Sequence, residues 1–575
     1  MQINPGEQPG LEELAYAGRL HIAPFADISI QIDQALNVQV DGSRSRPFSD
    51  ESPPVPIQSY HWTARARNPA PLTVLEPTGQ TLAGEVQAPR LTLSAPSVDG
   101  EYYLSLRVVD AHGRNDSSST YFVVADGRPC LRDWSWENTA WVDRAVVYGV
   151  IPRNFGPHGY NSITERLDDL QGLGVTALWL SPINATPPKN FGYHVLNYLE
   201  LSDQYGSKED FRRMVQAAHQ RGIRVLMDFV PNHTSDQHRY FQDTLTNGPA
   251  SPYYNFYDRD ETGNHTYYFH WTYLPNLNFN NPQVVNWITE AFVYWVRAFD
   301  VDGFRVDVAW GIRERNPEYW PRWRQALMRI KPDLLLLAEA GARDDYYFTE
   351  GYDSAYDWTD ELGHWAWEHV FEDRALLTER LQAALTQNGK GFHPDALIFR
   401  FLNNNDTAER FLTRCGLEMT RVATALLLTL PGLPCLYTGD EIGAEFMPYK
   451  NPEPIGWVLD PHNLRPYHQK LIALRKTVPA LHSRNWNLLP AEPRQQVFAY
   501  LRTAAGREPP VLVVLNFGET PAEASLPLPA GFDDFKNRDS LFDLLTERSI
   551  AVSGQNPLTV HLPPMSAYLL SLPSI

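Results

Sequence analysis

Residues 301–309 read VDGFRVDVA, a short apolar run that carries Arg305 and Asp307 two residues apart. In a β-strand these two side chains would share one face, because successive side chains point to opposite faces. Runs of the same kind recur along the chain, separated by stretches with helical periodicity. They are AVVYGV (145–150), VTALWLSP (175–182), IRVLMDFV (223–230), DLLLLAEA (333–340), DALIFRFL (395–402) and PCLYTGD (434–440). Strands that alternate with helices imply right-handed crossovers, and this many of them predict an α/β fold with a closed (β/α)₈ TIM barrel.

Strand-like sequence flanks the barrel on both sides. In GEYYLSLRVVDAHGR (100–114), apolar and polar residues alternate between Pro, Gly and Ser punctuation, and QVFAYLRT (496–503) and PPVLVVLNFGE (509–519) return to strand and turn signals. We therefore expect three domains: an N-terminal β-sandwich at 1–135, the barrel at 136–480 and a C-terminal β-sandwich at 481–575.

Composition narrows the class of partner. The 575 residues are 43% hydrophobic and 20% charged, and the formal net charge of -19 argues against nucleic acid or an anionic membrane. The cysteines, Cys130, Cys415 and Cys435, are spaced for neither a zinc site nor a disulfide framework. Without a leader pattern or a membrane span, a cytoplasmic location is the default expectation, or a secreted or periplasmic one if a leader has been removed. The oligomeric state stays open, a dimer included.

Polar side chains follow the apolar runs where the predicted strands end. They are Asp228, Asn232 and His233 after the third run, Arg305 and Asp307 in the fourth, Glu339 in the fifth and Asp406 after the sixth. In a (β/α)₈ barrel the carboxyl ends of the strands carry the active site, so these groups should meet at one mouth. Any one of them could be a strand-end cap or part of an internal salt bridge. Three acids, an arginine and a histidine together favour catalysis.

Paired carboxylates with a nearby guanidinium suit glycoside hydrolysis. A retaining enzyme needs one carboxylate as nucleophile and one protonated carboxyl as acid, about 5–5.5 Å apart. Asp307 and Glu339 come from consecutive predicted strands and supply such a pair. Burial after four leucines also makes Glu339 a candidate for a raised pKa. The motifs of metalloproteases, α/β-hydrolases and P-loop enzymes are absent from the sequence.

Four motifs make the chain similar to the α-amylase family of retaining glycoside hydrolases. They are DFVPNH (228–233), GFRVD (303–307), the glutamate of LLAEA (336–340) and FLNNND (401–406), in the family's order. The resemblance covers about 140–480 and implies a small domain B inserted at about 234–275. The extra N-terminal β-domain resembles that of the neopullulanase and cyclomaltodextrinase branch.

The resemblance also implies roles for individual residues. Asp307 would be the nucleophile, Glu339 the general acid and base, and Asp406 the carboxylate that binds sugar hydroxyls. Arg305 would hold Asp307 ionised. His233 and Tyr193 match positions that hydrogen-bond to the sugar and stack on it at the cleavage point.

The sequence departs from the family at two substrate-binding positions. Asn405 stands where His is usual before the third carboxylate, and we expect its amide to donate one neutral hydrogen bond to the sugar. Trp310 stands where many relatives carry Lys, which leaves contacts on the leaving-group side open. The chemistry requires no cofactor. A structural calcium ion remains an expectation resting on Asn232 alone, since the resemblance supplies no other ligand for an ion that takes six to eight oxygens.

The predicted function is hydrolysis of α-1,4-glucosidic bonds in starch, maltooligosaccharides or cyclodextrins by double displacement. The same residues would serve an α-glucan transglycosylase, in which a sugar hydroxyl replaces water. A non-catalytic, amylase-like binding protein is a third reading, although such a protein would be expected to lose its catalytic acids.

Overall fold

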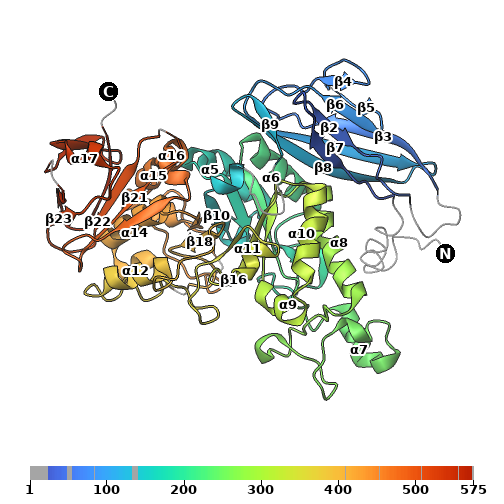
Figure 1. Cartoon of the computed structure of the whole chain (residues 1–575). Coiled ribbons are helices and arrows are strands. Elements are labelled where there is room, and N and C mark those ends of the chain that lie inside the picture. Colours follow the sequence, from blue (N-terminus) through green and yellow to red (C-terminus); the bar gives the residue numbers. More distant parts are fainter. Residues whose placement is uncertain are drawn as a thin grey trace.

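The computed structural model describes residues 24–47, 55–82, 84–131, 140–407, 409–451, 453–506, 508–553 and 556–572. In Figure 1 a central barrel separates the blue N-terminal sheets from the red C-terminal sheets. None of the helices in these ranges is both long and apolar enough to cross a membrane.

Eight parallel strands close into the predicted barrel, which confirms the (β/α)₈ fold class. Nearly every strand residue is buried, because the barrel is filled by side chains inside and covered by helices outside. In order around the barrel the strands are β10 (Val147–Val150), β11 (Ala177–Leu180), β14 (Arg224–Phe229), β15 (Gly303–Val306), β16 (Leu335–Gly341), β17 (Ser354–Tyr356), β18 (Leu397–Phe401) and β19 (Leu433–Tyr437).

Amphipathic helices surround the barrel. Among them α6 begins with a capping box, in which Ser207 and Asp210 satisfy each other's backbone N–H groups. The main helices of the barrel are α5 (Leu167–Leu173), α6 (Lys208–Gln220), α8 (Pro282–Phe299), α9 (Ala309–Arg315), α10 (Tyr319–Ile330), α12 (Leu377–Thr386), α14 (Leu417–Thr429) and α15 (Arg465–Thr477). The short ones are α2 (Ala140–Asp143), α3 (Pro152–Phe155), α4 (Tyr160–Glu165), α11 (Tyr346–Thr349), α13 (Phe411–Cys415) and α16 (Pro479–His482).

Two antiparallel sheets precede the barrel. One contains β1 (Ser29–Ile32), β2 (Val38–Asp41), β6 (Arg90–Leu93) and β4 (Val74–Glu76), and the other β5 (Val86–Gln87), β3 (Ile57–Ala64), β7 (Gly100–Asp110), β8 (Asn115–Ala125) and β9 (Arg128–Cys130). Ion pairs fasten them to the barrel: Asp116 contacts Arg297 at 2.5 Å and Arg329 at 2.7 Å. The expected domain boundary at 135/136 and the first 23 residues of the expected domain lie outside the described residues.

Two further sheets follow the barrel. They are β20 (Trp486–Leu489), β21 (Val497–Arg502), β22 (Val511–Asn516), β27 (Ser566–Ser571), β24 (Ser540–Asp543) and β25 (Arg548–Ala551), with β23 (Ala522–Leu526) and β26 (Leu558–Leu562) apart; the helix α17 (Asp533–Lys536) lies between β23 and β24 in the chain. The expected boundary at 480/481 falls inside α16, one turn before β20.

A long insertion between β14 and α8 projects from the carboxyl end of the barrel, where Figure 1 shows α7 (Arg239–Asn247) away from both sandwiches. It contains α7 and three 3₁₀ turns, Gly248–Ala250, Tyr254–Phe256 and Tyr268–His270. Isolated bridges, such as His233 with Asn276 and Tyr257 with Leu277, close the insertion on the strand end. We call residues 234–281 the inserted segment.

Candidate active site

The buried guanidinium of Arg305 contacts carboxylates from three neighbouring strands. Arg305 pairs in register with Asp228 on β14, and its Nη1 lies 3.0 Å from Asp228 Oδ1 and 2.8 Å from Asp307 Oδ1. Its Nη2 lies 2.8 Å from Glu339 Oε1 at the end of β16. Its Nε donates to the hydroxyl of Tyr356 at 3.1 Å. The predicted nucleophile and acid therefore contact adjacent nitrogens of one side chain.

The backbone after Asp307 turns sharply toward Glu339. Val308 has φ 48 and ψ 42, a left-handed conformation that is an outlier for a β-branched residue and costs on the order of 1–3 kcal/mol. The turn points the Val308 N–H at Glu339 Oε2, which accepts it at 2.7 Å. The strained turn thus fixes Glu339 beside the strand that carries Asp307.

The carboxylates outnumber the positive charge that they share. Burial, together with the charge of Glu339, raises the pKa of Asp307 well above its usual value. Burial raises the pKa of Asp228 to about 7, although Arg305 opposes this rise. Burial and carboxylate repulsion therefore favour protonation of Asp307 and Asp228, and Arg305 is the group that opposes this at both residues.

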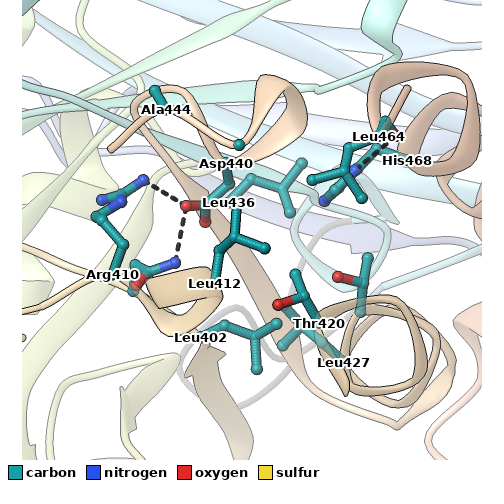
Figure 2. Close-up of a pocket in the computed structure, with 13 residues that line it drawn as sticks. Leu402, Arg410, Leu412, Thr420, Leu427, Leu436, Asp440, Ala444, Leu464 and His468 are labelled. Atoms are coloured by element: carbon teal, nitrogen blue, oxygen red, sulfur yellow. Dashed lines mark hydrogen bonds and ion pairs between the residues drawn. The ribbon is translucent and has the colours of Figure 1, made fainter. Parts of the chain in front are cut away.

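Hydrogen bonds of Asn403 hold the polar loop that follows β18 in place. Asn403 donates to Asp440 Oδ1 at 2.8 Å, and its own Oδ1 accepts the backbone N–H of Phe411. Figure 2 shows Arg410 pointing at Asp440, and their ion pair measures 2.5 Å. The cavity behind these groups has about 20 Å³, room for about one water molecule. Asn403 is therefore the anchor of the loop.

The next residues of the loop arrange one another. Asn404 Oδ1 accepts the backbone N–H groups of Asp406 and Thr407, both at 2.9 Å, which makes an Asx turn. Asn405 Nδ2 donates to Asp406 Oδ1 at 2.9 Å and to the Tyr193 hydroxyl at 3.1 Å. Asn404 therefore makes the turn of the loop, and Asn405 contacts both Asp406 and Tyr193.

The expected hydrogen bond from Asn405 to the sugar needs a correction. Both amide hydrogens have protein partners, whereas the buried Oδ1 has none among the described residues. The carboxylate of Asp406 only accepts, so it fixes the amide with its nitrogen toward Asp406. A hydrogen bond from Asn405 to the sugar would therefore require one of its two protein contacts to break, and the buried Oδ1 is not open to the sugar either.

Asp406 is exposed at the mouth and electrostatically linked to the cluster. Desolvation between the walls of the mouth and the charge of Glu339 raise the pKa of Asp406 to about 6. Tyr193 lies beside it through Asn405, and its hydroxyl also contacts the Tyr449 hydroxyl at 2.9 Å. The structure thus places Tyr193, Asn405 and Asp406 together.

His233 lies at the mouth, but its ring nitrogens are engaged within the protein. Nε2 lies 3.1 Å from the Tyr193 carbonyl oxygen and Nδ1 lies 3.1 Å from Asn232 Nδ2. Burial lowers the pKa of His233 to about 3, so the ring is neutral. The expected hydrogen bond from His233 to the sugar would require one of these contacts to break. The observed contacts instead position Tyr193.

The residues around Asn232 do not fit a calcium ion. Asn232 Oδ1 accepts from Arg315 Nη2 at 2.6 Å, and its backbone oxygen accepts from the same nitrogen at 3.3 Å and from the Leu277 N–H at 3.0 Å. The described residues include no group of three or more His, Cys, Asp or Glu side chains arranged to hold a metal. A guanidinium stands where the resemblance implies a cation.

Aromatic side chains of the inserted segment divide into two sets. Phe256 and Tyr257 are buried and form its core. A second set lies exposed and continues from the mouth: Tyr268 stacks on His233 at 5.2 Å, and Phe269 lies 5.7 Å from Trp310. We call this second set the aromatic row: Tyr268, Phe269, Trp271, Tyr273 and, from α9, Trp310. Its most exposed members are Phe269 at 52%, Trp271 at 47% and Tyr273 at 40%.

Three contributors to the site were not predicted. They are Tyr356, Tyr449 and Arg315. Tyr356 ends the short strand β17 just before Asp357, but its run of three strand residues is too short to be recognised as a strand from the sequence. An arginine close after the nucleophile strand was the one available signal for Arg315.

Comparisons with known proteins found a matching family model and several relatives. The family model described as "Alpha amylase, catalytic domain" matches residues 154–454. A cyclomaltodextrinase of Geobacillus thermopakistaniensis is 30% identical over 514 residues, 84% of this chain and 82% of that protein. An intracellular maltogenic amylase of Bacillus subtilis is 31% identical over 353 residues, 57% of each chain.

Solved structures superpose over most of the molecule. A cyclomaltodextrinase covers 96% of this chain and 98% of its own, with a TM-score of 0.66 and 20% identity. A maltogenic α-amylase of Thermotoga neapolitana covers 75% of this chain and 99% of its own, with a TM-score of 0.64 and 22% identity. At such identities these superpositions bear on the fold alone.

Proposed function

This chain belongs to the α-amylase family, and from that premise we propose that it hydrolyses α-1,4-glucosidic bonds of α-glucans with retention of configuration. One observation carries the proposal: Asp307 and Glu339 contact adjacent nitrogens of Arg305, each at 2.8 Å. Two carboxylates held so closely favour the short separation of retaining enzymes, about 5–5.5 Å, over the roughly 6.5–9.5 Å of inverting ones.

In the first step, an oxygen of Asp307 forms a bond to the anomeric carbon while the glycosidic C–O bond breaks. The leaving oxygen takes the proton of Glu339. Arg305 stays between the two carboxyls and opposes the rise in the pKa of Asp307 that burial and Glu339 cause, so it favours the ionised form that attacks. The Val308 N–H supports the carboxylate that Glu339 becomes once its proton has left.

In the second step, Glu339 takes a proton from water as the water oxygen bonds to the anomeric carbon. The ester bond to Asp307 breaks, which restores both carboxyls. Asp406 accepts hydrogen bonds from sugar hydroxyls, and its exposure at the mouth supports that role. Asn405 orients the Asp406 carboxylate through its amide nitrogen.

The aromatic row supports a substrate longer than a disaccharide. Apolar faces of glucose rings pack on aromatic faces, and Phe269, Trp271 and Trp310 continue outward from the carboxylates. Maltooligosaccharides, starch and cyclodextrins all present such a series of rings. Among these substrates, the names of two relatives, cyclomaltodextrinase and maltogenic amylase, support short or cyclic α-glucans as the substrates of this chain.

A transglycosylase would use the same residues with a sugar hydroxyl in place of water. The decisive experiment is a product profile on maltotriose, β-cyclodextrin, soluble starch and pullulan, with the Asp307→Asn variant as the blank. Hydrolysis with retention releases shorter sugars whose new reducing end is first the α-anomer by proton NMR. Products longer than the substrate as the main species would make it a transferase, and an initial β-anomer would overturn retention.

A further inference from the structure

A row of hydrogen bonds connects α9 to the cleavage point. Arg315, the last residue of α9, donates to Asn232 Oδ1. Asn232 Nδ2 lies 3.1 Å from His233 Nδ1, and His233 Nε2 lies 3.1 Å from the Tyr193 carbonyl oxygen. We propose that Arg315 is a positioning residue that acts through Asn232 and His233 to hold Tyr193 against the sugar, and that its guanidinium takes the place of a metal ion there.

Each bond in the row determines the direction of the next. A guanidinium only donates, so the Asn232 amide must turn its oxygen toward Arg315 and its nitrogen toward His233. His233 Nδ1 must then accept, which leaves the single proton of the neutral ring on Nε2. Only that tautomer can donate to the Tyr193 carbonyl. The hydrogen bond from Arg315 therefore favours, through Asn232, the same His233 tautomer that the Tyr193 carbonyl requires.

Packing around Asn232 leaves this arrangement little freedom. Asn232 and His233 are each 1% exposed. Asn232 Nδ2 also donates to Asn276 Oδ1 at 3.2 Å, which ties the strand end to the inserted segment. A Cβ on Gly311 would lie 2.8 Å from Asn232 Oδ1, so α9 approaches as closely as it does only with glycine there. Close packing therefore holds Asn232 and His233 in this hydrogen-bonded arrangement.

The same geometry explains why a calcium ion does not fit. Asn232 already gives its side-chain oxygen and its backbone oxygen to Arg315. Desolvation lowers the pKa of Arg315 to about 10, and the charges of Asp258 and Glu314 oppose this, so the guanidinium stays charged at neutral pH. A divalent cation at the same oxygens would face a fixed like charge.

The test compares Arg315→Met and Arg315→Lys with the matched control Arg313→Met. Arg313 lies on the same helix, pairs with Asp344 and is outside the row. We expect Arg315→Met to lower kcat/KM on maltotriose roughly 10- to 100-fold, Arg315→Lys to recover part of the loss because it keeps a charged donor, and Arg313→Met to stay within about 3-fold of wild type.

Nitrogen NMR of labelled histidine measures the tautomer of His233 and so tests the row without an activity assay. In the wild type, His233 should show only the tautomer protonated on Nε2, and Arg315→Met should mix the tautomers, as should Arg315→Lys to a smaller degree. Millimolar CaCl₂ should leave the wild-type His233 signals in place.

An unchanged His233 tautomer in Arg315→Met overturns the positioning role, and if that variant does not fold, an unchanged tautomer and kcat/KM in Arg315→Lys do the same. Calcium-dependent shifts of the wild-type His233 signals overturn the replacement of a metal. The activity arm rests on the proposed function, whereas a chain inactive on every α-glucan with the His233 signature intact would refute only that function.

Discussion

The side-chain amide nitrogen of Asn405 lies 2.9 Å from Oδ1 of Asp406. Because the carboxylate can only accept, this contact fixes the amide with its nitrogen toward Asp406, while the same nitrogen also donates to the Tyr193 hydroxyl. Asn405 therefore positions two residues that the resemblance assigns to sugar binding.

Removal of the Asn405 side chain should therefore weaken catalysis moderately. One neutral hydrogen bond contributes about 0.5–1.5 kcal/mol, so Asn405→Ala should lower kcat/KM on maltooligosaccharides roughly 2- to 13-fold. Asn405→Asp should place a second carboxylate beside Asp406 and raise the pKa of Asp406 above about 6. If kcat/KM requires ionised Asp406, its acidic limb should move to higher pH in Asn405→Asp. An unmoved limb with unchanged kcat/KM in both variants would contradict the positioning of Asp406 by Asn405.

Asp307→Asn should abolish turnover while the protein stays folded. An amide cannot form the glycosyl ester, yet it occupies nearly the same volume beside Arg305. Steady-state kinetics on maltotriose, with circular dichroism as the folding control, measures the effect. A variant that keeps more than a tenth of wild-type kcat would exclude Asp307 as the nucleophile.

Glu339→Gln should be slowed strongly on maltooligosaccharides and much less on α-maltosyl fluoride. Fluoride departs with little help from a proton, so this substrate bypasses the acid step. The ratio of the two kcat/KM values is the measurement. Equal losses on both substrates would point to another acid.

Trp271→Ala should weaken the binding of long substrates. Trp271 is 47% exposed in the aromatic row, so its loss should raise KM for soluble starch several-fold, by about 1 kcal/mol for one aromatic contact, with kcat on maltotriose unchanged. Leu245→Ala is the control, since Leu245 is exposed on α7 and outside the row. Identical KM values for starch in Trp271→Ala and wild type would remove the row from the substrate path.

Glu290→Gln should stabilise the protein increasingly as the pH rises. Glu290 on α8 is buried, its Oε1 has no described partner, and burial raises its pKa from 4.5 to about 8. The folded state then binds the proton more tightly than the unfolded state, so this group's contribution to stability is present below about pH 4.5 and lost as the pH rises through about 8.

The gain of Glu290→Gln over wild type should grow across that window, to roughly 5 kcal/mol at most, and level off above it. Melting temperatures measured at several pH values test this, with the exposed Glu379→Gln on α12 as the control. A gain that is independent of pH would show that Glu290 is not buried as an acid.

The sequence by itself determined the barrel and the order of its catalytic groups. Buried parallel strands need continuous apolar runs, and the carboxyl ends of barrel strands carry the active site, so Asp228, Arg305, Asp307, Glu339 and Asp406 were visible as polar residues in or after such runs. Periodicity along the chain carries this information because it is local.

The direction of each hydrogen bond was decided only by the tertiary structure. Asn405 and His233 can both donate or accept. Each contacts a neighbour in the chain, Asp406 or Asn232, but both also contact Tyr193, which comes from a distant segment. Arg315 follows the nucleophile strand by only a few residues, yet its role depends on the close approach of α9 to the end of β14, which no local pattern records. A side chain that can either donate or accept a hydrogen bond takes its role from the neighbour that the fold places beside it.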